Sequence, residues 1–105
     1  MSEYVTLRTR LRAGMAEAYD KAHATIWPEM RAAQQEVGIK RWMIFRDGLD
    51  LFHVVECDDF DGAMAALESM PVDQRWQAEM AKFVVQRDDG RGGATVRLKL
   101  VYDGG

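Results

Sequence analysis

The sequence predicts an α+β domain of the ferredoxin-like plan, with elements in the order βαββαβ and an antiparallel sheet. Four segments alternate apolar and polar residues with a period of two, and the two regions between them repeat apolar residues with the period of a helix. An Asp-Gly turn signal separates the two middle strands, which indicates a hairpin. A chain of 105 residues suffices for one domain, so we expect residues 1–105 to fold as a single unit.

The first strand is expected over residues 4–12, where alternating side chains share one face: Val5, Leu7, Thr9 and Leu11. Residues 15–37 carry two separate apolar stripes, which predicts two helical segments rather than one. The first stripe is Met15, Ala18, Tyr19 and Ala22, and the second is Ile26, Met30, Ala33 and Val37. We expect Thr25 to cap the second segment, Pro28 to lie in its first turn and Gly38 to end it.

The next two strands are expected over residues 39–47 and 51–57, joined by a turn at residues 47–50. In the first of them, alternation places Trp42, Ile44 and Arg46 on one face and the side chains of Arg41, Met43 and Phe45 on the other. A hairpin of this kind brings two antiparallel strands into direct contact.

A second helical region follows three aspartates that can cap a helix and favour its first turn: Asp58, Asp59 and Asp61. Its first stripe is Phe60, Ala63, Met64 and Leu67, and a further helix after Pro71 carries Val72, Trp76, Met80 and Phe83. We expect a polar loop over residues 88–93. The last strand is expected over residues 95–102, with Val96, Leu98, Leu100 and Tyr102 on one side.

This order of elements places the helices on one face of the sheet and leaves the other face to be covered. A second copy of the chain would cover it most simply, so we expect a homodimer that forms a dimeric α/β barrel. The net charge of -3 and the lack of a basic tract argue against a nucleic-acid partner. No apolar run is long enough to span a membrane. One cysteine, Cys57, and no signal peptide pattern favour the cytoplasm.

Tyr19 and His23 are the strongest candidates for chemistry, because residues four apart on a helix project from the same face. His23 can act as a general acid or base at neutral pH. Spacing alone, however, favours a capping or surface histidine. Tyr19 can orient a hydroxylated ligand or relay a proton, and it can equally be a core residue whose hydroxyl reaches water.

Three tryptophans are many for so short a chain, and their rings suit the C–H faces of a sugar. Trp27 and Trp76 also fit apolar helical patterns, whereas Trp42 alternates with charged Arg41 and fits a core less well. His53 is expected to be a strand residue at the border of a pocket. No ligand spacing for a metal and no nucleotide-binding motif occurs, so we expect neither a metal nor a cofactor.

The run His23-Ala24-Thr25-Ile26-Trp27-Pro28-Glu29 is similar to a motif of the L-rhamnose mutarotase family. The resemblance extends over most of the chain through Tyr19, Trp42, Leu51-Phe52, Val55-Glu56 and Gln74-Arg75-Trp76. It implies a dimer of ferredoxin-like subunits that interconverts the α and β anomers of a free sugar without a cofactor. It also implies that His23 is the catalytic proton donor and that Tyr19 binds the sugar.

The chain departs from the family pattern at three places. Ala24-Thr25 stands where the family has Asn-Pro, Trp42 replaces a sugar-contacting tyrosine, and Trp76-Gln77 replaces a Trp-Trp pair. Because the catalytic position is kept while sugar-contact positions change, we expect a related deoxyhexose such as L-fucose to be a candidate substrate beside L-rhamnose. Trp42, Trp76 and Gln77 would shape the pocket.

These patterns and the resemblance together predict an isomerase, a sugar mutarotase that opens the ring by acid/base chemistry at His23. Two alternatives remain open. One is a non-catalytic dimeric α/β barrel that binds a small ligand, and the other is a cofactor-free monooxygenase of the same fold.

Overall fold

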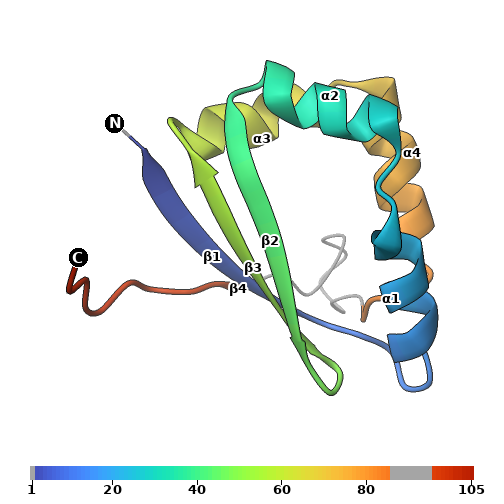
Figure 1. Ribbon diagram of the computed structural model, residues 1–105. Coiled ribbons are helices and arrows are strands. Elements are labelled where there is room, and N and C mark those ends of the chain that lie inside the picture. Colours follow the sequence, from blue (N-terminus) through green and yellow to red (C-terminus); the bar gives the residue numbers. More distant parts are fainter. Residues whose placement is uncertain (1, 86–95) are drawn as a thin grey trace.

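Four antiparallel strands form the sheet in the order β2-β3-β1-β4, and the helices lie along one of its faces (Figure 1). The computed structural model describes residues 2–85 and 96–105. The elements are β1 (Glu3–Arg10), α1 (Ala16–Ala24), α2 (Pro28–Glu36), β2 (Ile39–Asp47), β3 (Asp50–Cys57), α3 (Phe60–Glu68), α4 (Pro71–Met80) and β4 (Val96–Arg97). This order and pairing confirm the predicted ferredoxin-like fold class. In the described part of the chain, no helix is long and apolar enough to cross a membrane.

The central strands β1 and β3 pair along their whole length, and β2 pairs with β3 through the expected hairpin. The tight turn of the hairpin contains Gly48 at a φ of 60°, a backbone conformation that glycine adopts without strain. Leu7 and Ile44 are both register partners of His53, so these three positions form one row across the sheet. The row faces the helices.

A β-bulge between Ile39 and Arg41 changes the facing of β2 near its start. Simple alternation would put Ile39 on the same face as Arg41, away from the helices. The bulge inserts one extra residue into the pairing, and Ile39 is buried in the same core against which Trp42 and Ile44 pack. The two faces predicted for Trp42 and Met43 are correct from the bulge onward.

The break between α1 and α2 occurs where the sequence predicts it, but Thr25 does not cap α2. Thr25 is the C-cap of α1, with extended φ and ψ of -139° and 106°, and Trp27 is the N-cap of α2. Pro28 explains the difference, because the residue before a proline is forced out of the helical region and the proline itself begins the helix. Gly38, at a φ of 92°, directly follows the C-cap of α2.

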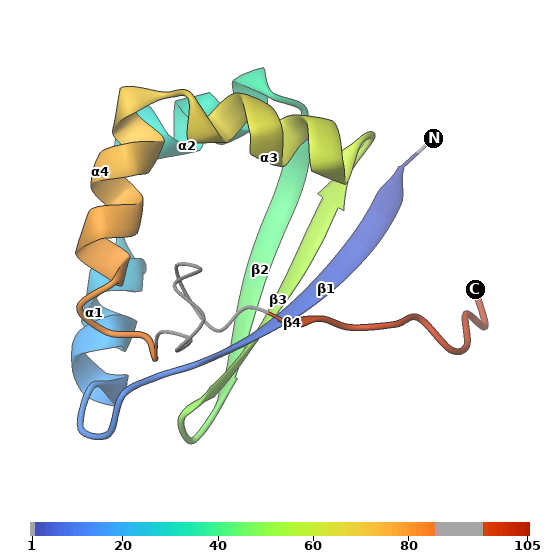
Figure 2. The ribbon, with the colours of Figure 1, turned by 180° about the vertical axis from the view of Figure 1, so that it is seen from behind.

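The helices enclose the interior from two sides, with α2 and α3 across one end of the sheet and α1 and α4 standing away from its other end (Figures 1 and 2). The Asp59 side chain accepts a hydrogen bond from the Gly62 N–H and caps α3, as expected. The inward stripes of the helices meet the sheet in one cluster, whose largest fully buried members are Leu11, Leu51, Val55 and Cys57.

The last strand is much shorter than predicted. β4 comprises Val96–Arg97, paired with β1, and the Leu98 N–H adds one further bond to the Thr6 carbonyl. Beyond that point no strand of residues 2–85 or 96–105 lies beside the alternating apolar side chains, and Leu100 and Tyr102 are exposed. The prediction for residues 98–102 is therefore wrong for this chain taken alone. Thr95 and the loop expected over residues 88–93 lie outside the described residues.

Candidate active site

A cavity of about 700 Å³ lies between the helix-facing side of the sheet and helices α1, α2, α3 and α4. All five residues selected from the sequence line it: Tyr19, His23, Trp42, Trp76 and Gln77. They come from three elements that are far apart in the sequence, namely α1, β2 and α4. The cavity therefore exists only when the helical layer closes over the sheet. Its size is typical of a pocket for a small molecule.

His23 is fixed near the end of α1 by its own helix. Its ring stacks on the Tyr19 ring, with centroids 4.0 Å apart and planes inclined by 29°. Its Nδ1 lies 3.0 Å from the Tyr19 carbonyl oxygen. Because a carbonyl oxygen can only accept, Nδ1 carries the hydrogen of this bond. In the neutral ring, Nε2 is therefore left as the basic nitrogen.

The environment of His23 lowers its pKa below 6.5. Burial is the main cause, because the imidazolium loses hydration when the ring is half-buried. The hydrogen bond to the Tyr19 carbonyl and the nearby Asp20 carboxylate oppose this shift. His23 is thus neutral at pH 7 and ready to accept a proton at Nε2.

The Trp76 ring also contacts the His23 imidazole, and Trp27 packs on Trp76 in turn. The Trp76 ring meets it edge to face at a centroid distance of 5.5 Å, and Trp27 packs on Trp76 in the same way at 5.0 Å. Trp76 is buried, whereas Trp27 is 37% exposed and packs against Trp76 from outside the buried core. The aromatic contacts restrict the orientation of the imidazole without giving it a charged partner.

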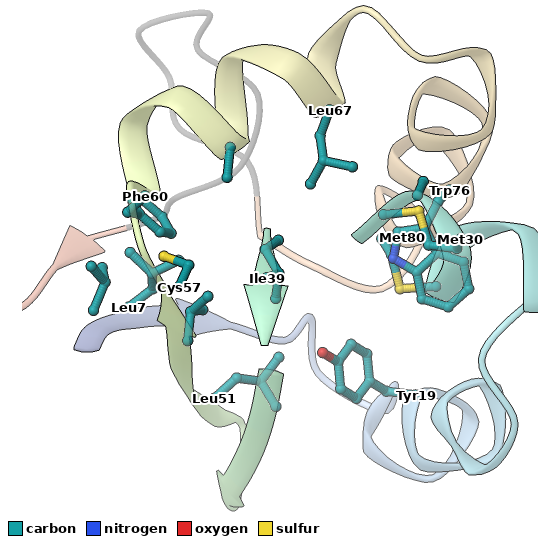
Figure 3. Close-up of a cluster of buried hydrophobic side chains, with 14 of the residues drawn as sticks. Leu7, Tyr19, Met30, Ile39, Leu51, Cys57, Phe60, Leu67, Trp76 and Met80 are labelled. Atoms are coloured by element: carbon teal, nitrogen blue, oxygen red, sulfur yellow. The ribbon is translucent and has the colours of Figure 1, made fainter. Parts of the chain in front are cut away.

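Tyr19 points from α1 into the space between sheet and helices, where Trp76, Met30 and Met80 also lie (Figure 3). Phe83 packs edge to face on its ring at 6.1 Å. Burial is the main cause that raises the pKa of Tyr19 above its ordinary value of 10. The phenol therefore keeps its proton at neutral pH and can donate a hydrogen bond.

Trp42 of β2 and His53 of β3 form a hydrogen-bonded pair on the side of the cavity that the sheet lines. The Trp42 Nε1–H donates to Nδ1 of His53 over 3.1 Å, and Nε2 of His53 lies 3.0 Å from the Thr9 hydroxyl oxygen. All three side chains line the cavity. The sequence predicts only that His53 borders a pocket and that Thr9 shares a strand face with Val5, Leu7 and Leu11.

Asp73 is a cavity residue that the sequence patterns did not reveal. It lies in the first turn of α4, is 6% exposed, and accepts a hydrogen bond from the Gln77 side-chain amide over 3.3 Å. Burial raises the pKa of its carboxyl above 3.8. Its position four residues before Gln77 is the signal that could have indicated it, because the two share a helix face.

The cavity therefore combines a basic imidazole nitrogen, a phenol donor, a carboxylate paired with an amide, and two indole rings. Such a set can bind a small hydroxylated molecule and transfer protons on it. In residues 2–85 and 96–105, no group of three or more His, Cys, Asp or Glu side chains could hold a metal ion.

Comparisons with known proteins agree with these features. The family model for L-rhamnose mutarotase matches residues 5–103. An L-rhamnose mutarotase from Sinorhizobium fredii is 41% identical over 103 residues, which cover 95% of this chain and 96% of that protein.

Solved structures show the same fold at lower identity. An L-rhamnose mutarotase from Formosa agariphila superposes with a TM-score of 0.79 at 21% identity, covering 96% of this chain and 97% of that one. A dimeric ferredoxin-like protein from an uncultured marine organism has a TM-score of 0.62 at 16% identity, covering 95% of this chain and 88% of that one.

Proposed function

The chain belongs to the L-rhamnose mutarotase family, and we propose that it is an isomerase that interconverts the α and β anomers of a free deoxyhexose. L-Rhamnose is the first candidate substrate, because the names of the family and of the relative with 41% identity both specify this sugar. The observation that carries the proposal is the placement of His23. Its ring lines the cavity with Nδ1 committed to the Tyr19 carbonyl, which leaves Nε2 as the basic nitrogen.

The proposed reaction needs one proton removed from the anomeric hydroxyl and one added to the ring oxygen. Neutral His23 accepts the hydroxyl proton at Nε2, and the electron pair left on that oxygen forms the aldehyde as the bond from C1 to the ring oxygen breaks. The resulting imidazolium returns the proton to the ring oxygen. Both oxygens are attached to C1, so one imidazole reaches each in turn. After rotation about the C1–C2 bond, the steps run in reverse and close the other anomer.

The remaining groups bind and orient the sugar in this proposal. Tyr19 donates its phenol hydrogen to a sugar oxygen, since its raised pKa keeps it protonated. Gln77, held by Asp73, presents an amide to sugar hydroxyls. Trp42 and Trp76 provide apolar faces for the C–H surfaces of the ring. Trp42 stands where the family resemblance implies a tyrosine, so L-fucose is the second candidate substrate.

We also propose that the working form is a homodimer in the cytoplasm. The sheet face away from the helices carries Met43, Phe45, Phe52 and Val54, and Phe45 is 56% exposed in the single chain. A second copy would cover this face and provide a neighbour for residues beyond β4. The one cysteine, Cys57, is buried and free, which suits a reducing compartment.

Anomer exchange followed by NMR tests the function. Saturation of the anomeric proton of one anomer is transferred to the other only when exchange is fast, so we expect the protein to produce transfer with L-rhamnose or L-fucose at neutral pH. D-Glucose serves as the comparison sugar, and boiled protein as the blank. Binding of these sugars without accelerated exchange would favour a non-catalytic binding protein and contradict the proposal.

A further inference from the structure

We propose that His53 is a positioning residue: it stays neutral with its hydrogen on Nε2, so that it fixes the Trp42 indole against the cavity wall and leaves the Thr9 hydroxyl hydrogen free for a bound sugar. The statement about the sugar rests on the proposed mutarotase function. The statement about the imidazole is independent of that function and is tested separately.

The donors and acceptors of the three side chains determine where the hydrogens lie. An indole nitrogen can only donate, so the 3.1 Å contact requires His53 Nδ1 to be an unprotonated acceptor. A neutral imidazole with a bare Nδ1 carries its hydrogen on Nε2. Nε2 therefore donates to the Thr9 oxygen 3.0 Å away. In both hydrogen bonds that link Trp42, His53 and Thr9, the donor and the acceptor are therefore determined.

Protonation of His53 would break this chain. It would place a hydrogen on Nδ1 facing the Trp42 N–H, so two donors would oppose each other in a half-buried site. Burial, and to a smaller extent the nearby His23, lowers the pKa of His53 to about 4. In the described part of the chain, His23 on α1 is the titratable group whose charge acts on it, while β1 and β2 present Thr9 and Trp42. The two histidines thus have different roles. His23 has a basic Nε2 that can accept a proton, whereas both ring nitrogens of His53 are used in hydrogen bonds.

The arrangement assigns distinct roles to Trp42 and Thr9 at the cavity wall. The indole N–H is the single polar group of the Trp42 side chain and is used by His53, so Trp42 offers a ligand only its apolar ring. Thr9 accepts from His53 and retains its own hydroxyl hydrogen to donate. Both side chains line the cavity. A sugar bound there would meet the flat apolar Trp42 ring and, beside it, the Thr9 hydroxyl donor. This arrangement favours a sugar that has an acceptor oxygen next to a C–H face.

Ring-nitrogen NMR of the sugar-free protein tests the imidazole statement. Long-range ¹H–¹⁵N spectra at pH 8 and pH 5.5, with His53→Gln used for assignment, are expected to show a protonated Nε2 and a bare Nδ1 for His53 at both pH values. A hydrogen on Nδ1 at pH 8, or convergence of the two nitrogen shifts at pH 5.5, would overturn it. No sugar is present, so this result stands whether or not the protein is a mutarotase.

Thr9→Val and Thr9→Ser test the statement about the sugar. Thr9→Val keeps the shape but removes the hydroxyl, and we expect KM for the exchanged sugar to rise about tenfold while kcat changes less than about twofold. Thr9→Ser restores the hydroxyl and should restore KM. An unchanged KM in Thr9→Val, or no rescue by serine, would overturn this statement. No exchange by the unaltered protein would overturn it together with the mutarotase proposal, leaving the imidazole result intact.

Discussion

The position of one hydrogen atom on His23 determines what its ring can do. The spacing of Tyr19 and His23 predicts that they share a helix face, and the stacked rings 4.0 Å apart confirm it. The sequence could not predict that Nδ1 bonds to the Tyr19 carbonyl, because that depends on the side-chain rotamer. It also could not predict burial, which decides that the ring is neutral at pH 7.

The rate of anomer exchange should depend on pH through His23. Its pKa is lowered below 6.5, so the basic form predominates at pH 7 and is lost as the pH falls through that lowered value. We expect the enzymatic rate to be flat between pH 7 and 8 and to fall about tenfold per unit below the His23 pKa. Exchange measured by NMR from pH 4.5 to 8, corrected for the spontaneous rate, checks this. A midpoint at or above 6.5 would contradict the neutral imidazole.

Individual elements were predicted well where the signal is local to the strand or helix. The hairpin of β2 and β3, the Asp59 cap and the break before Pro28 all follow from residues close together in the chain. Thr25 was misassigned because two helix ends meet within a few residues, and side-chain type alone does not say which end it serves. The bulge at Ile39 depends on pairing with β3, which no local pattern contains.

A forked ion pair joins Arg46 of β2 to Asp20 of α1, which is next to Tyr19 in the sequence. The guanidinium contacts both carboxylate oxygens, at 2.9 and 2.7 Å. We expect Arg46→Gln to reduce kcat several-fold, because it removes this link between α1 and β2; it also removes the bond from Arg46 to the Gly48 carbonyl. The free energy of unfolding should fall only slightly, since the pair is exposed to solvent. Exchange rates and thermal unfolding measure the two effects.

Arg10→Gln is the matched control for this pair. It removes the single contact from Arg10 to Asp50, which joins β1 to β3 and touches no helix. We expect a similar small loss of stability but an unchanged kcat. Equal losses of kcat in Arg46→Gln and Arg10→Gln would show that the contact to α1 has no special role.

At the scale of the whole molecule, the sequence predicts the order of elements and the layer that covers the sheet, but not the residues that the cavity collects. No local pattern indicates Asp73 or Thr9, because each joins the site only when α4 and β1 face each other across the interior. The last strand was predicted too long. The alternation in residues 98–102 predicts a strand, but in the described part of the chain only the Leu98 N–H bonds to β1 beyond β4.

The uncovered sheet face leads to a prediction about assembly. Phe45→Asp places a charge on the apolar face away from the helices, and we expect it to convert a homodimer into a monomer, whereas Phe45→Leu should remain dimeric. Size-exclusion chromatography with light scattering distinguishes the two masses. A monomeric unaltered protein at tens of micromolar would contradict the dimer.

The most direct test of the account is the exchange rate of His23→Gln. Glutamine fills similar space but cannot accept a proton, so we expect the NMR exchange rate on the preferred sugar to fall by at least about 100-fold while thermal unfolding changes little. Lys21→Gln, an exposed change on the same helix, should exchange as fast as the unaltered protein. If His23→Gln also exchanged the anomers at the unaltered rate, proton transfer by His23 would be wrong.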